Sequence, residues 1–355
     1  ALLSAEAALS LDFHSESFTR SPFNGFTVSR PQFDRWYAEQ AIAAGALLVP
    51  ETVVDDLLWE DGRVAGVVAR RALGNVRADV VIAADGANSL LAQRAGLRSG
   101  LPPQDLALGV KEIIALPRQV IEERFNLAGD EGAALEFIGT FSQGVQAGGF
   151  IYTNRESLSV GVVANLASLR ARRLGIATLL DDFKAHPTVR RLIGGGVARE
   201  YAAHLVPEGG WPALPPLLGD GILLAGDAAG LVCATGLSLE GANYAIASGL
   251  AAAEAVKLAK SRGDYSKATL AGYEQILRER FVLRDLELYR GVPALLAQPR
   301  LYQAYPEAAC AFFEDLLTVD GRPKRHVRHL AKNALAGKAS LWQLLWDLVE
   351  GGRAL

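Results

Sequence analysis

The sequence has little of what metal sites, disulfide frameworks and membrane spans require. Its 355 residues include only two cysteines, Cys233 and Cys310, and neither stands in a C-x-x-C pair or beside a pair of histidines. This spacing excludes a disulfide framework, a structural zinc site and a protein-held iron-sulfur cluster, and it favours a reducing compartment. We interpret both cysteines as buried apolar residues.

Excess charge and long apolar runs are also missing. The net charge is -3, and no long Lys/Arg cluster occurs, so nucleic acid is not an expected partner. No run reaches the roughly 18 apolar residues of a membrane span, and Ala1 opens no signal peptide. We expect a cytoplasmic protein, either free or associated with the inner face of the membrane. Methionine is absent as well, and motif spacings are therefore interpreted with a tolerance of about one residue.

The first third of the chain alternates predicted strands and helices. Pro31, at a first-turn position, predicts a helix over residues 30–44. The turn Asp61-Gly62 predicts a hairpin between strands 53–59 and 64–70. Further strands are expected at residues 11–14, 25–28, 47–49 and 75–84.

The middle third is rich in β signals, and the last third is helical. Strands are expected at residues 106–116, 135–139, 148–153 and 158–164, which suggests an inserted antiparallel sheet. Further strands at 201–206 and 221–225 lead back, and long helices are expected at 239–259 and 267–284. The pattern predicts one nucleotide-binding domain interrupted by a substrate domain.

The strongest chemical motif is a buried strand that runs into Gly226-Asp227-Ala228-Ala229-Gly230. Such a turn lets the backbone approach a ligand closely, and a following helix can offer its N–H groups to phosphate. Asp227 could accept hydrogen bonds from sugar hydroxyls, or it could merely cap a helix.

Two weaker motifs precede it. A second apolar strand ends at Asp85-Gly86 and leads into a helix, which by itself is a common strand-to-helix turn. Arg30, at the start of the helix that carries Phe33 and Trp36, could bind a pyrophosphate as a bidentate donor, although such an arginine is more often a solvated cap.

In this order, the three motifs resemble the FAD-contacting segments of glutathione-reductase-type flavoproteins. Further segments extend the resemblance to the FixC and electron-transfer-flavoprotein:quinone oxidoreductase family over nearly the whole chain. These segments are Gly109-Val110-Lys111-Glu112, residues 148–154, His204-Leu205-Val206-Pro207-Glu208 and residues 315–321.

The resemblance implies an α/β fold, α+β overall. It comprises an interrupted FAD-binding domain over residues 1–100 and 218–262, an inserted antiparallel β-rich substrate or quinone domain over 101–217, and a C-terminal helical region over 263–355. FAD is the implied cofactor, no metal is expected, and catalytic residues are not identified. The implied cofactor-binding residues are Arg30, Asp85, Gly86, Gly226, Asp227, Ala228, Ala229 and Gly230.

The resemblance also implies a mechanism. Electrons would pass from the subunits of an electron-transfer flavoprotein through FAD to a quinone, to a small ferredoxin-like protein, or to both, in metabolism such as nitrogen fixation. The flavin performs the redox chemistry, so no acid-base dyad is required. An apolar quinone entrance is a candidate role for residues 291–313 and 342–349, which could equally be core.

The sequence departs from the family at its start. The G-x-G-x-x-G turn that seats the ADP half of FAD is not recognisable before Leu11, so weak or absent FAD binding is expected. Two alternatives follow: an NAD(P)H-dependent reductase or monooxygenase of the geranylgeranyl-reductase and aromatic-hydroxylase group, and a non-enzymatic assembly subunit. His204 could lie near the flavin or be structural, and His326 and His329 are interpreted as part of a solvated basic face.

Overall fold

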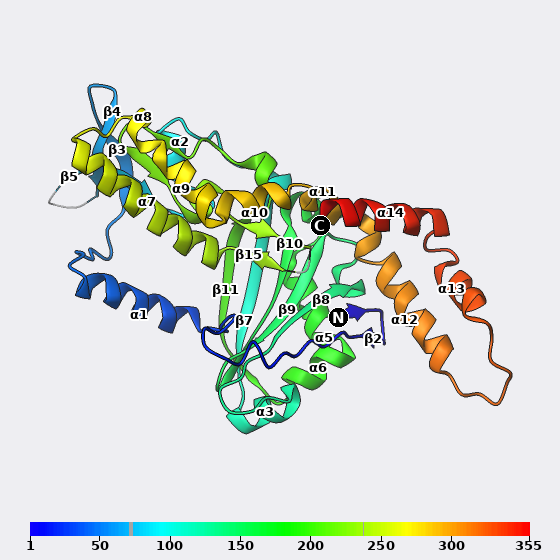
Figure 1. The fold of residues 1–355 in the computed structure, drawn as a ribbon. Coiled ribbons are helices and arrows are strands. Elements are labelled where there is room, and N and C mark those ends of the chain that lie inside the picture. Colours follow the sequence, from blue (N-terminus) through cyan, green and yellow to red (C-terminus); the bar gives the residue numbers. More distant parts are fainter. Residues whose placement is uncertain (71–73, 237) are drawn as a thin grey trace. The chain divides into compact units, whose positions relative to one another are not determined.

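The computed structural model describes residues 1–70, 74–236 and 238–355 (Figure 1). The chain forms two compact units. The first comprises Ala1–Leu47, Leu108–His204 and Leu296–Glu350, and the second comprises Leu48–Ala107, Leu205–Leu295 and Gly351–Leu355. Across the described ranges, no helix has both the length and the apolar content needed to cross a bilayer. The functional domain boundaries given above stay a prediction.

A seven-stranded sheet forms the centre of the first unit, in the order β11-β7-β10-β9-β8-β1-β2. The strands β8, β9 and β10 pair antiparallel, as the alternating pattern predicts, and β1 joins β8 in parallel. The bounds are β1 Leu2–Leu3, β2 Ala8–Leu9, β7 Leu106–Ala115, β8 Ala134–Gly139, β9 Ala147–Thr153, β10 Ser157–Asn165 and β11 Val197–Pro207.

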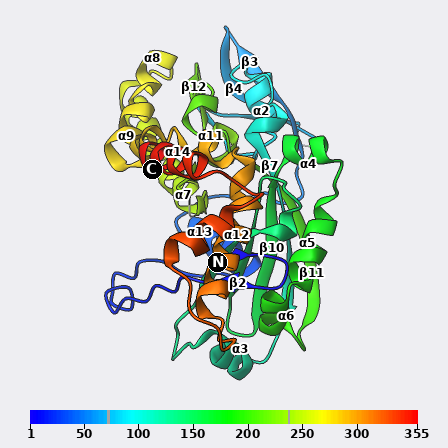
Figure 2. The same cartoon turned by 90° about the vertical axis from the view of Figure 1, so that its right-hand side faces the viewer.

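Helix α5 (Ile176–Ala185) packs its apolar side against this sheet and completes the core of the unit. The buried ring of Phe183 lies 5.2 Å from that of Phe137 and 5.0 Å from that of Phe141. Gly149 on β9 makes room for it, because a Cβ there would stand 2.6 Å from the Phe183 ring. Figure 2 shows α5 and α6 alongside the long strands. The other helices are α1 Arg30–Ala43, α3 Arg118–Phe125, α4 Leu166–Arg172, α6 Pro187–Ile193, α12 Ala304–Leu317, α13 Val327–Leu335 and α14 Leu341–Ala354.

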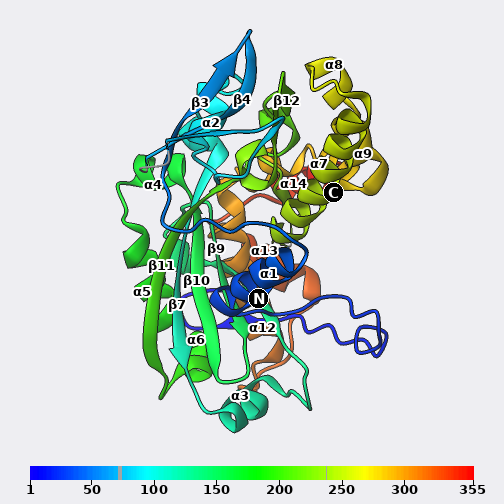
Figure 3. The same cartoon turned by 90° about the vertical axis from the view of Figure 1, so that its left-hand side faces the viewer.

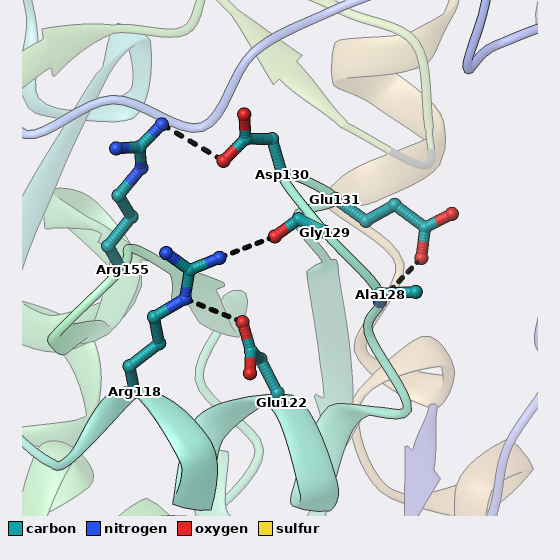
Figure 4. A network of polar contacts seen from close by, with 7 residues as sticks. All are labelled: Arg118, Glu122, Ala128, Gly129, Asp130, Glu131 and Arg155. Atoms are coloured by element: carbon teal, nitrogen blue, oxygen red, sulfur yellow. Dashed lines mark hydrogen bonds and ion pairs between the residues drawn. The ribbon is translucent and has the colours of Figure 1, made fainter.

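Polar contacts fasten helix α3 to the loop that follows it (Figure 4). Arg118 pairs with Glu122 at 2.6 Å and donates to the carbonyl of Gly129 at 2.7 Å. Arg155, on the turn between β9 and β10, pairs with Asp130 at 3.0 Å. Because these groups are largely exposed, their ion pairs add little to the free energy of unfolding. Their main effect is to order the loop.

The second unit holds two three-stranded sheets, in the orders β12-β13-β6 and β3-β4-β5, and a two-stranded one of β14 and β15. Helix α7 buries a row of alanines, among them Ala247, Ala251 and Ala255, and Figure 3 shows α8 and α9 beside it. Strand bounds are β3 Val54–Glu60, β4 Arg63–Ala69, β5 Asn75–Arg77, β6 Val81–Ala83, β12 Leu218–Gly219, β13 Ile222–Leu224, β14 Cys233–Ala234 and β15 Leu239–Glu240. Helix bounds are α2 Leu90–Arg94, α7 Ala242–Arg262, α8 Lys267–Leu270, α9 Gly272–Arg280, α10 Val282–Leu288 and α11 Val292–Leu296.

The structure confirms the mixed α/β class with its helical C-terminal region, but several element predictions are wrong. Residues 11–14, 25–28 and 47–49 form no strand, and their apolar side chains, such as Leu11, are largely exposed. The strand expected at 75–84 is two strands in different sheets, β5 beside β4 and β6 beside β13. The helix expected at 267–284 is broken into α8, α9 and the start of α10.

Candidate functional site

Two of the three predicted motifs meet at one edge of the β12-β13-β6 sheet. Strands β6 and β13 run parallel, with Ala83 paired to Leu224 at their carboxyl ends. The amide of Ala225 donates to the carbonyl of Ala83 at 3.0 Å, which holds the two chain segments together as they leave the sheet. Ligands of open α/β sheets bind outside the carboxyl ends of such strands.

The loop after β13 is held in place by close contacts with helix α7. Gly226 has a φ of +58°, and a Cβ on it would stand 3.1 Å from the Cβ of Ala245 on α7. Its amide donates to the buried Ser248 hydroxyl at 2.9 Å. Ala228 and Ala229 are fully buried, and Gly230 turns the chain with a φ of +71°. These residues therefore hold the loop in one shape.

The helix expected over residues 239–259 is present as α7 (Ala242–Arg262), but it does not follow this loop directly. Gly226–Ala229 forms a single 3-10 turn, η4, which is followed by the short strands β14 and β15. Helix α7 begins only at Ala242. The loop thus offers backbone groups of a tight turn rather than the N-terminus of a long helix.

Asp85 accepts hydrogen bonds from the N-terminal end of helix α2, which supports the interpretation of the second motif as a common strand-to-helix turn. Its carboxylate accepts hydrogen bonds from the Ser89 hydroxyl at 2.6 Å and from the Leu91 amide at 3.0 Å. Gly86 behaves differently, because its φ is +81° and a Cβ built on it meets no described atom within 4 Å. The backbone at Gly86 is therefore open to a ligand.

Arg98 ties the two loops together, and sequence reasoning missed it. Its guanidinium donates to the carbonyl of Ala87 at 2.6 Å and to that of Ala228 at 3.0 Å. The side chain is buried, with 8% exposed, and its Nε has no hydrogen-bond partner in the described ranges. Burial lowers the pKa of the Arg98 guanidinium, and the negative charge of Asp85 opposes this shift. No local pattern marks Arg98, because Ala228 follows it by 130 residues.

Arg30, the third predicted element, belongs to the first unit. It stands at the start of α1, as expected, with Ser29 before it and Pro31 in the first turn. Its guanidinium pairs with Asp34 one turn later, Nε to Oδ1 at 2.9 Å, and both side chains are exposed. The pyrophosphate role of Arg30 stays a prediction.

The remaining cysteine and histidine predictions can be placed. Cys233 and Cys310 are both buried, in agreement with their interpretation as apolar residues. His204 lies exposed on β11, and His326 caps α13 by accepting from the Arg328 amide at 3.3 Å. No cluster of three metal-ligating side chains occurs in the part of the chain that the structure describes.

The residues of the second unit fit a phosphate-bearing nucleotide. Gly86 leaves open space at the carboxyl end of β6. Arg98 supplies a buried positive charge between the two loops, and its Nε has no hydrogen-bond partner among the described residues. Glycine backbone and a fixed cation are what a pyrophosphate requires. Asp85, Gly86 and Gly226 to Gly230 are thus brought to one place, and Arg30 is held in the other unit.

Comparisons with known proteins find relatives over nearly the whole chain. Residues 292–355 match the model of the ETF-QO/FixC family C-terminal domain. The chain is 41% identical to the probable electron transfer flavoprotein-quinone oxidoreductase YdiS of Escherichia coli K12 over 353 residues, which cover 99% of this chain and 82% of that protein. It is 44% identical to protein FixC of the same organism over 321 residues, which cover 90% of this chain and 74% of that protein.

A solved structure shows the same fold at lower identity. The geranylgeranyl bacteriochlorophyll reductase-like protein of Thermoplasma acidophilum superimposes with a TM-score of 0.65 and 23% identity, covering 91% of this chain and 75% of that one. The relatives confirm the resemblance predicted from the motifs and the prediction of an oxidoreductase. The chain belongs to the family of electron transfer flavoprotein-quinone oxidoreductases and FixC proteins.

Proposed function

We propose that this protein is an FAD-dependent dehydrogenase that passes electrons from an electron-transfer flavoprotein to a quinone, to a ferredoxin-like protein, or to both. The observation that carries the proposal is the parallel pairing of β6 with β13, which brings the Asp85-Gly86 and Gly226–Gly230 loops to one sheet edge. The family relationship supports the choice of reaction, since a relative is named an electron transfer flavoprotein-quinone oxidoreductase.

In this proposal, the protein binds and orients while the flavin supplies the redox chemistry. The Gly86 backbone and the η4 turn would hold phosphate and ribityl oxygens. The small side chains of Ala228 and Ala229 are buried, and the turn packs against α7. Arg98 would keep both loops at a fixed separation and add positive charge beside the phosphates.

The proposed partners are the two subunits of an electron-transfer flavoprotein as donor, and a quinone or a small ferredoxin-like protein as acceptor. A lipid-soluble acceptor favours contact with the inner face of the membrane. Nitrogen fixation is the proposed setting by analogy with the name FixC.

A matched pair of glycine variants tests the cofactor site. Gly86→Asn places a side chain in the open space beside the loop, and asparagine tolerates the φ of +81° better than other residues do. We expect flavin affinity to fall at least roughly tenfold, since the side chain would occupy ligand space. Gly96→Asn is the control, because Gly96 has a φ of +68° and the same open surroundings at the end of α2.

The measurement is the absorption of the purified protein between 350 and 500 nm after reconstitution with FAD. Equal flavin content in the two variants would overturn the site assignment. Reduction of the bound flavin by an electron-transfer flavoprotein, but not by NADPH, is the expected result for the donor. Turnover of NADPH without any protein partner would instead establish the reductase or monooxygenase alternative.

A further inference from the structure

Strand β11 (Val197–Pro207) forms an uncovered edge of the seven-stranded sheet. The order of that sheet ends at β11, which lies beside β7, and Figure 1 shows β11 at the margin of the long strands. Its first eight residues, 197–204, are all exposed, so both faces of the strand meet solvent. The side chains of Val197 and Tyr201 are 54% and 56% exposed.

The sequence of β11 does not protect this edge against another strand. Edge strands are commonly protected by brevity, by lysine or proline, by a bulge, or by a covering helix. The opposite edge of the sheet, β2, is only two residues long, and α12 packs against it. In contrast, residues 197–206 contain no proline, lysine or glycine. The edge at β11 is therefore long and open to pairing.

Alternate backbone groups of β11 point away from β7. The Glu208 amide donates to the Asp105 carbonyl at 2.9 Å. A Cβ built on Gly109 would lie 3.6 Å from the His204 carbonyl oxygen, so the two strands run antiparallel. Because backbone groups alternate along a strand, every second residue of β11 directs its N–H and C=O outward. In the middle of the strand these residues are Arg199, Tyr201 and Ala203.

The charges on β11 favour one way of pairing it with a second copy of itself. Two copies related by a two-fold axis pair antiparallel, with the same strand contributed by each. An axis at Arg199 or Glu200 would place like charges directly opposite each other, which is destabilising. An axis at Tyr201 instead places Arg199 opposite Ala203 of the second copy. It also places Glu200 opposite Ala202 of the second copy, and the two tyrosine rings form a cross-strand pair.

We propose that two copies of this chain pair through β11 about a two-fold axis at Tyr201, which joins their sheets into one. An axis nearer the C-terminal end of the strand would bring Pro207, which has no N–H, into the pairing. Strand addition at an exposed edge is a common mode of recognition, in which main-chain hydrogen bonds supply affinity. A contact limited to one strand is small, so we expect a dimer that dissociates at roughly micromolar concentration. The proposal does not depend on the proposed electron-transfer function.

Two substitutions of the same kind, at neighbouring exposed positions, test this register. Ala203→Glu places a carboxylate opposite Arg199 of the second copy, and Ala202→Glu places one opposite Glu200 of the second copy. Opposite charges across paired strands attract and like charges repel, and each contact occurs twice in the dimer. We expect dimerisation at least about threefold tighter in Ala203→Glu and at least about threefold weaker in Ala202→Glu.

The measurement is sedimentation velocity of the full chain from about 1 to 200 µM, at low and high salt. The opposite shifts of the two variants should shrink at high salt, and circular dichroism checks that both are folded. Wild-type protein that stays monomeric over this range overturns the proposal, and so do shifts of equal sign, or no shift, in the two variants. If the chain is monomeric but Ala202→Glu weakens its binding to an electron-transfer flavoprotein, the edge serves that partner and the second-copy proposal falls.

Discussion

Replacing Arg98 tests whether its hydrogen bonds to both loops contribute to flavin binding. Arg98→Met keeps much of the side-chain volume but leaves the carbonyls of Ala87 and Ala228 without their shared donor. Leaving buried acceptors unsatisfied costs about 1–3 kcal/mol each. We expect weaker flavin binding and a lower denaturation midpoint.

The control for Arg98 is Arg94→Met. Arg94 lies on the neighbouring helix α2, is exposed, and approaches Asp56 only at 3.9 Å. Exposed pairs of this kind contribute about 0–1 kcal/mol. Isothermal titration with FAD and urea unfolding of both variants check the prediction. Identical affinities in Arg98→Met and Arg94→Met would show that Arg98 has no part in the site.

At the scale of elements, β8 and β9 share a polar pair with a definite pH signature. The Tyr152 hydroxyl donates to Glu136 Oε1 at 2.7 Å. Burial raises the pKa of the Glu136 carboxyl to about 7 from its ordinary value of 4.5, and the tyrosine opposes this shift. The folded protein therefore binds this proton more tightly than the unfolded chain does.

The sign of the resulting pH dependence follows from linkage. The contribution to the free energy of unfolding is largest below pH 4.5, is lost as the pH rises toward 7, and is constant above 7. The loss is roughly 3 kcal/mol at most. Glu136→Gln should remove this dependence, and Glu123→Gln, on the exposed side of α3, should keep it. Urea midpoints followed by circular dichroism across this pH range decide between the two.

At the scale of the whole molecule, the cofactor should act as a stabilising ligand. FAD at about 100 times its Kd would raise the free energy of unfolding by about 2.7 kcal/mol. Thermal unfolding with and without FAD should show this increase in the wild-type protein and in Gly96→Asn. Gly86→Asn, whose affinity is expected to be at least roughly tenfold weaker, should show at most about 1.4 kcal/mol at the same FAD concentration. An equal shift in all three would mean that FAD binds away from Gly86.

The fold was predictable from the sequence where burial and local pattern agree. Strands such as β9 alternate between buried and less buried side chains and end at turn residues, and helix α1 begins at Arg30 before Pro31. These strands and this helix could therefore be located from the sequence. Residues 11–14 and 25–28 have strand-like apolar patterns, but Phe13 and Phe26 are mostly exposed and neither segment forms a strand. Apolar patterns predict burial only when another element is available to cover them.

The site was predictable only in part, for a related reason. The turns at Asp85-Gly86 and Gly226-Asp227 have local signatures, and the parallel pairing of β6 with β13 brings them together. Arg98 and Ser248 act on these turns across long sequence separations and carry no signature of their own. Likewise, the sequence left open whether residues 342–349 are core or an apolar entrance, and the structure leaves Trp342 and Trp346 exposed.

The pairing of β6 with β13 also fixes an order of events during synthesis. When Arg98 has been synthesised, Ala228, whose carbonyl accepts from its guanidinium, still lies 130 residues further along the sequence. The long strands β7 to β11 lie between Arg98 and Ala228 in sequence and pair largely with one another. They can therefore assemble before the second unit has been fully synthesised. The strands of the first unit are therefore all available for pairing before the Gly226–Gly230 turn can reach Arg98.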